Sequence, residues 1–182
     1  MSSSGRPEYV LGIVEYEREV RRLAREHKGE PIPNSSPDHA QIVIENIFRN
    51  ASESVNILSG SLTPRVYGRE KVVREAALFL ASSHRNRVQI ILERDSPEDR
   101  GLNPLLREIA QFETVELRIA PEETQKLYSF HWIVTDNDCY RYEPDRKYAV
   151  AIAAFGDATG GRRLKDHHKR IWDKCLKREL VH

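Results

Sequence analysis

Two hydrophobic patterns alternate along this chain. In several segments, apolar residues recur every three or four positions, which is typical of helices with one buried face. Between these segments lie shorter runs that are apolar almost throughout, such as residues 87–92. Runs of that kind are typical of strands covered on both faces. The pattern predicts helices at residues 8–27, 38–50, 69–83, 103–111 and 161–180, and strands at 54–58, 87–92 and 114–120.

The stretch from residue 128 to residue 155 has a different pattern, which predicts three consecutive strands. Short β-prone runs alternate there with Asn and Asp, which favour tight turns because they tolerate left-handed backbone angles and bond their own backbone. Such short turns join antiparallel strands. The predicted strands are 130–134, 139–142 and 148–155, and the turns contain Asp136-Asn137 and Glu143-Pro144-Asp145.

The order of these elements predicts an α/β fold. Strands that alternate with helices form a parallel βαβαβ portion with right-handed crossovers, and the hairpins that follow add antiparallel strands. We therefore expect one mixed sheet with helices on both faces, plus an N-terminal helix. Residues 31–37 contain three prolines and predict a linker after that helix. The sequence leaves open whether the helix packs on its own domain or on a partner.

The composition argues against several classes of protein. The 182 residues include 29 basic and 28 acidic side chains, so no global field draws the protein to nucleic acid or membrane. Cys139 and Cys175 are too few for a disulfide framework or a zinc site. No apolar run is long enough to span a bilayer, and the first residues lack the layout of a signal peptide. We expect a soluble, cytoplasmic protein that needs neither metal nor cofactor.

The candidate chemistry centres on His131, which lies inside the first strand of the 128–155 stretch among apolar neighbours. The loop after the strand at 54–58 is rich in small residues, including Ser59 and Ser61. Its backbone N–H groups could hold an anion, and Arg65 could add donors. The alternatives are a half-buried structural histidine and an ordinary strand-to-helix loop.

Residues 131–138, His-Trp-Ile-Val-Thr-Asp-Asn-Asp, resemble the His-x-Lys-x4-Asp motif of the phospholipase D superfamily. With the order of elements, the resemblance covers roughly residues 37–180 and one half of the family's fold. It implies that His131 is a nucleophile that attacks a phosphodiester without metal, and that Asp138 is the motif aspartate. It also implies a homodimer, because the family's site needs a second copy of the motif.

The motif is incomplete, because Ile133 stands where the family has lysine. A second register places Ser129 at the histidine position and His131 at the lysine position. The family's transition state needs cationic or N–H donors aimed at its phosphate oxygens. Ser59, Arg65 or Arg141 could replace the lysine.

We therefore predict a degenerate, non-catalytic phospholipase D-like domain at residues 37–182, preceded by an N-terminal helix and linker at 1–36. It would bind a phosphate-bearing ligand or a protein partner in a regulatory role. One alternative is an active phosphodiesterase or nuclease that uses His131 across a homodimer. A second is a structural module of a larger assembly.

Three further features have two interpretations each. Asp136 and Asp138 either form turns or belong to the motif. The adjacent His167 and His168 point about 100° apart on a helix, which argues against a metal pair. The basic residues of the first and last helices are either solvated or contact nucleic-acid phosphates; they are Arg18, Arg21, Arg22, Arg25, Arg162, Arg163, Lys165, Lys169, Arg170, Lys174, Lys177 and Arg178.

Overall fold

The computed structural model describes residues 11–148 and 150–180. Within these residues the chain forms a mixed sheet of eight strands, in the order β1-β7-β6-β5-β2-β3-β4-β8. Three adjacent strands, β2 (Ser54–Ser59), β3 (Arg87–Leu92) and β4 (Val115–Ile119), are parallel to one another. All other neighbouring strands pair antiparallel. The predicted α/β fold with a mixed sheet is confirmed.

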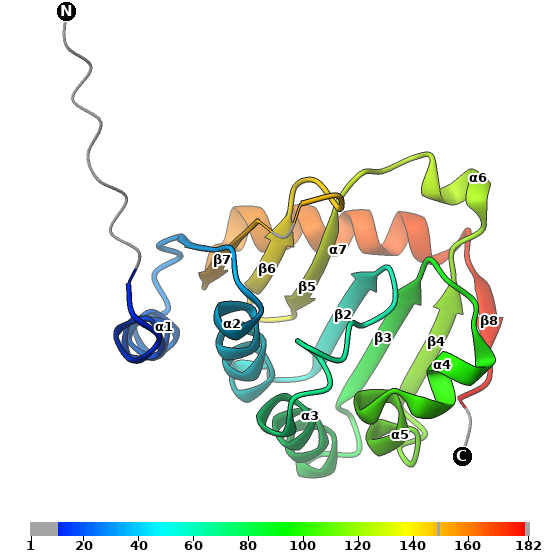
Figure 1. Cartoon of the computed structure of the whole chain (residues 1–182), viewed down its shortest axis with the longest axis horizontal. Helices are drawn as coiled ribbons and strands as arrows, with labels where there is room; N and C mark the ends of the chain where they lie inside the picture. Colours follow the sequence, from blue (N-terminus) through cyan, green and yellow to red (C-terminus); the bar gives the residue numbers. More distant parts are fainter. Residues whose placement is uncertain (1–10, 149, 181–182) are drawn as a thin grey trace, which may run out of the picture.

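Helices cover both faces of the sheet (Figure 1). On one face lie α2 (Pro37–Asn50), α3 (Glu70–Ser82) and α5 (Pro104–Ile109), over the larger of two hydrophobic clusters. On the other face, α7 (Ala158–Trp172) covers the smaller cluster. None of the helices in the described ranges combines the length and the apolar character needed to cross a membrane.

Strand β5 (His131–Thr135) shows how side chains are divided between the two faces. Successive strand residues point to opposite faces of a sheet. Ile133 is therefore buried in the larger cluster, whereas Trp132 and Val134 pack under α7. The same alternation holds for β6 (Cys139–Glu143), where Cys139 belongs to the larger cluster.

The N-terminal helix α1 (Ile13–Glu26) packs on its own domain, which resolves the question that the sequence left open. Tyr16, Val20 and Leu23 are buried in the larger hydrophobic cluster together with residues of α2. The Tyr16 hydroxyl also donates a hydrogen bond of 3.1 Å to the carbonyl of Pro33. Residues 8–10, which were predicted to be helical, lie outside the described ranges.

Part of the predicted linker is a strand, so the linker prediction is wrong there. Strand β1 (Ile32–Asn34) pairs antiparallel with β7 (Ala151–Phe155). Pro33 is tolerated because β1 forms the edge of the sheet, where one side of the backbone needs no partner. Both Ile32 and Asn34 face the core and are buried. A strand of three residues leaves too short a pattern to be recognised in a sequence.

The predicted C-terminal helix is too long. The structure ends α7 at Trp172, and Leu176–Arg178 forms strand β8, which pairs antiparallel with β4. Helical spacing of apolar residues continues to Leu176, so the sequence alone does not reveal that an open sheet edge captures this segment. The other boundary differences are smaller. Two short helices, α4 (Pro97–Leu102) and α6 (Glu122–Gln125), form in segments where the pattern predicts neither a helix nor a strand. The strand predicted at 148–155 begins at Ala151, with residue 149 outside the described ranges.

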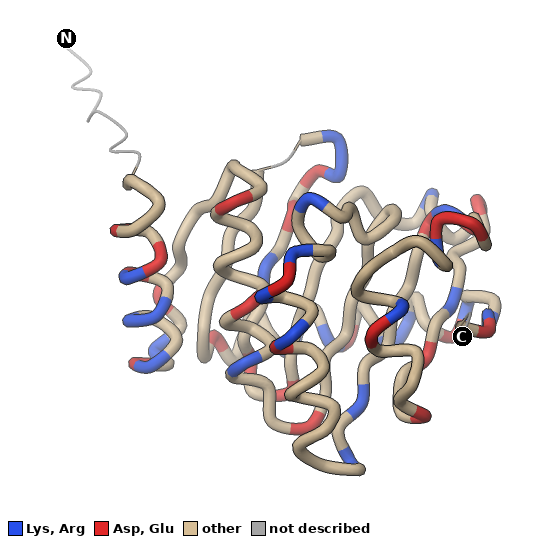
Figure 2. Tube along the Cα trace, turned by 60° about the horizontal axis from the view of Figure 1, so that its bottom comes forward, with Lys and Arg blue, Asp and Glu red and all other residues tan. Residues whose placement is uncertain are grey.

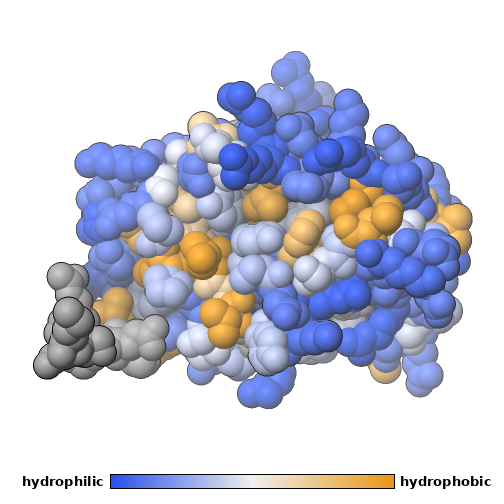
Figure 3. Space-filling view, turned by 90° about the horizontal axis from the view of Figure 1, so that it is seen from above, coloured by the Kyte–Doolittle hydropathy of each residue, from blue (hydrophilic) through white to orange (hydrophobic). Residues whose placement is uncertain are grey.

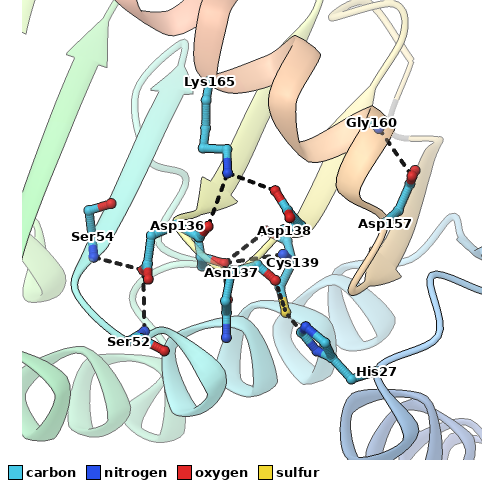
Figure 4. A network of polar contacts seen from close by, with 11 residues as sticks. His27, Ser52, Ser54, Asp136, Asn137, Asp138, Cys139, Asp157, Gly160 and Lys165 are labelled. Carbon is cyan, nitrogen blue, oxygen red and sulfur yellow. Dashed lines mark hydrogen bonds and ion pairs between the residues drawn. The ribbon is translucent and has the colours of Figure 1, made fainter.

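The turn between β5 and β6 is a polar anchor (Figure 4). Oδ1 of Asp136 accepts hydrogen bonds from the backbone N–H groups of Ser52, Glu53 and Ser54, at 3.3, 2.9 and 2.9 Å. Asp138 adopts a left-handed φ of 63° and accepts from Nζ of Lys165 at 2.7 Å. Both aspartates therefore form the turn, and they tie it to the start of β2 and to α7.

We expect Asp136→Ala to lower the free energy of unfolding by about 2 kcal/mol, because hydrogen bonds to a charged acceptor are worth roughly that much. Urea unfolding followed by circular dichroism measures it. Asp166→Ala is the matched control: this side chain is exposed on α7, and a change within about 0.5 kcal/mol is expected. Equal effects of the two substitutions would contradict the anchoring role.

Candidate functional site

A pocket of about 330 Å³ opens where β2 and β3 end and β5 begins. At this place β2 has β3 on one side and β5 on the other, so the direction of the sheet's connections changes. Ligands of α/β sheets bind at such switch points, outside the carboxyl ends of the strands. Figure 3 looks onto this end of the molecule, where strongly hydrophilic residues surround smaller hydrophobic patches.

His131 lies in this pocket between two carboxylates. Its Nε2 is 3.0 Å from Oε1 of Glu93, and its Nδ1 is 3.5 Å from Oε2 of Glu143. Glu143 is the residue directly opposite His131 on β6, whereas Glu93 follows the end of β3. The histidine side chain is only 15% exposed, so these partners rather than water determine its protonation.

Burial lowers the pKa of His131, but the hydrogen bonds and charges of Glu143 and Glu93 outweigh it, and the pKa is raised above its usual value. Burial raises the pKa of the two carboxylates, Glu93 and Glu143. Their contacts with His131 and with neighbouring arginines outweigh this effect and hold both pKa values below the usual value. These contacts thus favour the protonated imidazolium and the ionised carboxylates, compared with the same groups in water.

Ile133 occupies the position at which the superfamily motif has lysine, and a cationic side chain lies next to it on the neighbouring strand. Arg141 on β6 is the register partner of Ile133 and faces the same side of the sheet. Its Nε donates to Oδ1 of the buried Asn34 at 2.8 Å, and its Nη1 donates to Oε1 of Glu143 at 2.5 Å. These two bonds fix the guanidinium at the floor of the pocket.

Other cations and donors complete the lining. Arg146 donates to Oε1 of Glu93 at 2.7 Å, and Lys147 lies next to it. Arg65 and Arg94 also line the pocket, and within the described ranges neither has an ion-pair partner. The N-terminal turn of α2, including Pro37, adds the partial positive charge of a helix start.

The structure brings together five of the residues that the sequence singled out: His131, Ser59, Ser61, Arg65 and Arg141 all line the pocket. Asp138 and Ser129 do not. Asp138 follows the far end of β5 and is bonded to Lys165, and the carbonyl of Ser129 accepts from the backbone N–H of Arg146 at 2.8 Å. Their assigned roles in a site remain predictions.

Sequence reasoning missed Glu93, Arg94, Glu143, Arg146 and Lys147. A signal existed for the first two, because they follow β3 as Ser59 and its neighbours follow β2, and the ends of parallel strands meet at one edge. The backbone N–H of Glu93 indeed donates to the carbonyl of Ser59 at 3.1 Å. The others depend on the register of β5 with β6, which the sequence does not fix.

A sequence model of a protein family described as "Domain of unknown function (DUF7931)" matches residues 36–180. The chain belongs to the DUF7931 family. A search of curated proteins finds no match to this chain. The matched range contains the whole lining of the pocket but not α1 or β1.

Solved structures place the DUF7931 chain among phospholipase D-like folds. Nuc from Salmonella typhimurium, a phospholipase D family member, is 15% identical, with a TM-score of 0.59, and the similarity covers 82% of this chain and 99% of Nuc. NucT from Helicobacter pylori is 12% identical, with a TM-score of 0.59 over 83% and 100% of the two chains. The archaeal chromatin protein TrmBL2, whose structure shows a mode of DNA binding, is 12% identical, with a TM-score of 0.59 over 92% and 62%.

We expect Glu143→Gln to lower the pKa of His131, because it removes a carboxylate that stabilises the imidazolium. The titration is followed by NMR of the imidazole protons, assigned by their loss in His131→Gln. A raised pKa makes His131 stabilising at low pH: the contribution is full below the unfolded value of about 6.5 and is lost as pH rises through the folded value. Glu143→Gln should weaken this pH dependence, and an unchanged or higher pKa would refute the assignment.

Proposed function

We propose that this DUF7931 domain binds a phosphate-bearing ligand in the His131 pocket and does not hydrolyse it. The supporting observation is that carboxylates lie against both imidazole nitrogens, with Glu93 at Nε2 and Glu143 at Nδ1. A nucleophilic histidine needs a free lone pair on the attacking nitrogen. An imidazolium held between two carboxylates has none, so His131 is a structural group of the pocket and the neighbouring cations supply the charge for an anion.

The remaining lining supports anion binding. Five cationic side chains face a pocket whose acidic lining residue, Glu143, is already bonded to Arg141. Guanidinium groups bind phosphate through two parallel hydrogen bonds, and Arg65 and Arg94 retain that capacity in the described structure. Ser59 and Ser61 add hydroxyl groups for the remaining oxygens. A phosphate carried by a protein partner would use the same groups, and a regulatory role would follow from recognition without turnover.

The second candidate is an active phosphodiesterase, which the fold shared with the phospholipase D family member Nuc favours. It requires Glu93 to release Nε2 of His131, and it requires a second histidine from a homodimer.

A structural module of a larger assembly is a third candidate. Its docking surface would be the basic helices.

Nucleic acid is the phosphodiester whose binding the similarity to TrmBL2 favours. Acidic and basic residues are interleaved along α1 (Figure 2), where Arg21 and Arg22 are paired with Glu17, Glu19 and Glu26. These pairs neutralise two of the four arginines of α1 and so weaken it as a phosphate-binding surface. The exposed bases of α7, which include Arg162 and Arg170, are better placed for that role.

We expect the double variant Arg65→Ala/Arg94→Ala to bind a phosphate monoester such as phenyl phosphate at least about tenfold more weakly than the wild type, because each lost ionic hydrogen bond contributes about 1.5–3 kcal/mol. Isothermal titration calorimetry at fixed ionic strength measures the affinity. Arg162→Ala/Arg163→Ala, with two exposed arginines of α7, is the control and should retain wild-type affinity. An equal loss of affinity in both variants would show that binding depends only on the overall charge, and it would refute binding in the His131 pocket.

A hydrolysis assay separates the first two candidates. We expect no turnover of bis(p-nitrophenyl) phosphate, DNA or RNA by the wild type or by His131→Ala, because Nε2 is not available as a nucleophile. Light scattering under the same conditions reports whether a dimer forms. Activity in the wild type that disappears in a folded His131→Ala would overturn the proposal and make His131 catalytic.

A further inference from the structure

A second pocket lies on the opposite face of the sheet from His131. It has a volume of about 480 Å³ and opens between α7 and the amino ends of β2 and β3. Its walls include Asn56 and Gln89, which are register partners on the two strands, and Arg87 at the start of β3. From α7 it is lined by Lys165, His168 and Lys169.

The feature that points to a ligand is His168. Its side chain is only 2% exposed, and it is stacked on Trp172 with ring centroids 5.6 Å apart. Its Nδ1 is 3.3 Å from Nε1 of Trp132, and because an indole N–H can only donate, Nδ1 is the acceptor. The proton of the neutral ring must therefore be on Nε2.

Nε2 of His168 is buried and has no hydrogen-bond partner in the described part of the chain. Burial lowers the pKa of His168 to about 3, so the ring is neutral at pH 7 and Nε2 remains an N–H donor. Nδ1 is directed to Trp132, which is not part of the pocket wall, so Nε2 is the ring nitrogen left for the pocket. A buried donor without an acceptor is costly and rare in folded proteins.

The charged groups around the pocket favour an acceptor that is an anion. Arg87 and Lys169 have no ion-pair partner within the described residues, whereas Lys165 is bonded to Asp138. Two acidic residues also line the pocket, but Oδ1 of Asp136 already accepts three backbone N–H groups, and Asp173 lies at the exposed end of α7. Asp173 is also without an ion-pair partner in the described ranges, so Arg87 and Lys169 leave a net positive charge, and the amides of Asn56 and Gln89 supply further hydrogen bonds.

We propose that this pocket binds a small carboxylate or phosphate anion, one oxygen of which accepts from Nε2–H of His168 while Arg87 and Lys169 neutralise its charge. The site is independent of the His131 pocket, since it lies on the other face and at the other end of the parallel strands. It therefore stands whether or not the first pocket binds phosphate.

The test uses protein labelled with ¹⁵N-histidine in the Arg65→Ala/Arg94→Ala background, so that the first pocket does not contribute. Succinate or inorganic phosphate is titrated at constant ionic strength, and long-range ¹H–¹⁵N spectra follow the ring nitrogens of His168. We expect a saturable shift of Nε2 with Nδ1 little changed. The anion with the lower dissociation constant identifies the chemical class.

Adding Arg87→Ala/Lys169→Ala should raise the dissociation constant at least tenfold, whereas Arg162→Ala/Lys174→Ala, which removes two exposed bases outside the pocket, should not. His168→Phe, which keeps the stacking but removes the donor, should also abolish saturable binding as read from tryptophan fluorescence; its melting temperature checks that it is folded. No saturable shift up to about 50 mM of either anion, or equal affinity in all variants, would overturn the proposal and leave a site for water only.

Discussion

The antiparallel pairing of β5 with β2 is the constraint on which the rest of the fold depends. It joins the parallel half of the sheet to the antiparallel half, in the register that sets Ile57 opposite Ile133. Because side chains alternate, this register sends His131 to the face of α2 and Trp132 to the face of α7. A slip of one residue would exchange the two and destroy both pockets at once. The three backbone bonds to Asp136 hold the register at one end.

The His131 pocket shows how the same residues can support binding and oppose catalysis. The carboxylates that stabilise the imidazolium occupy both ring nitrogens and make the histidine a poor nucleophile, whereas the arginines that line the pocket supply the positive charge that an anion needs. The bonds of Arg141 to Asn34 and Glu143 offset the unfavourable burial of its charge. They also hold the guanidinium in one position. The sheet therefore holds the charged groups of the pocket in place before any ligand binds.

The sequence predicted the central elements well because their signals are local. β3 is a continuous apolar run, and its predicted and observed bounds agree. His131 was found because it lies inside such a run, and Ser59 and Arg65 were found because they lie in the loop that follows one. β1 and β8 were missed because each has three residues and forms only through backbone pairing with a distant strand. Glu143 and Arg146 were missed for the same reason: their positions depend on a register and a loop path that no local pattern encodes.

The boundary of the DUF7931 family match and the boundary of the packed hydrophobic core are different. The family match begins at residue 36, yet Asn34, which holds Arg141 in the pocket, comes two positions earlier. The helix before it contributes Tyr16 and Val20 to the same core that α2 completes. A fragment cut at the family boundary would leave the edge of β7 unpaired and its hydrophobic neighbours in water, which favours intermolecular strand pairing. The segment outside the family match is thus an integral part of the hydrophobic core and of the pocket.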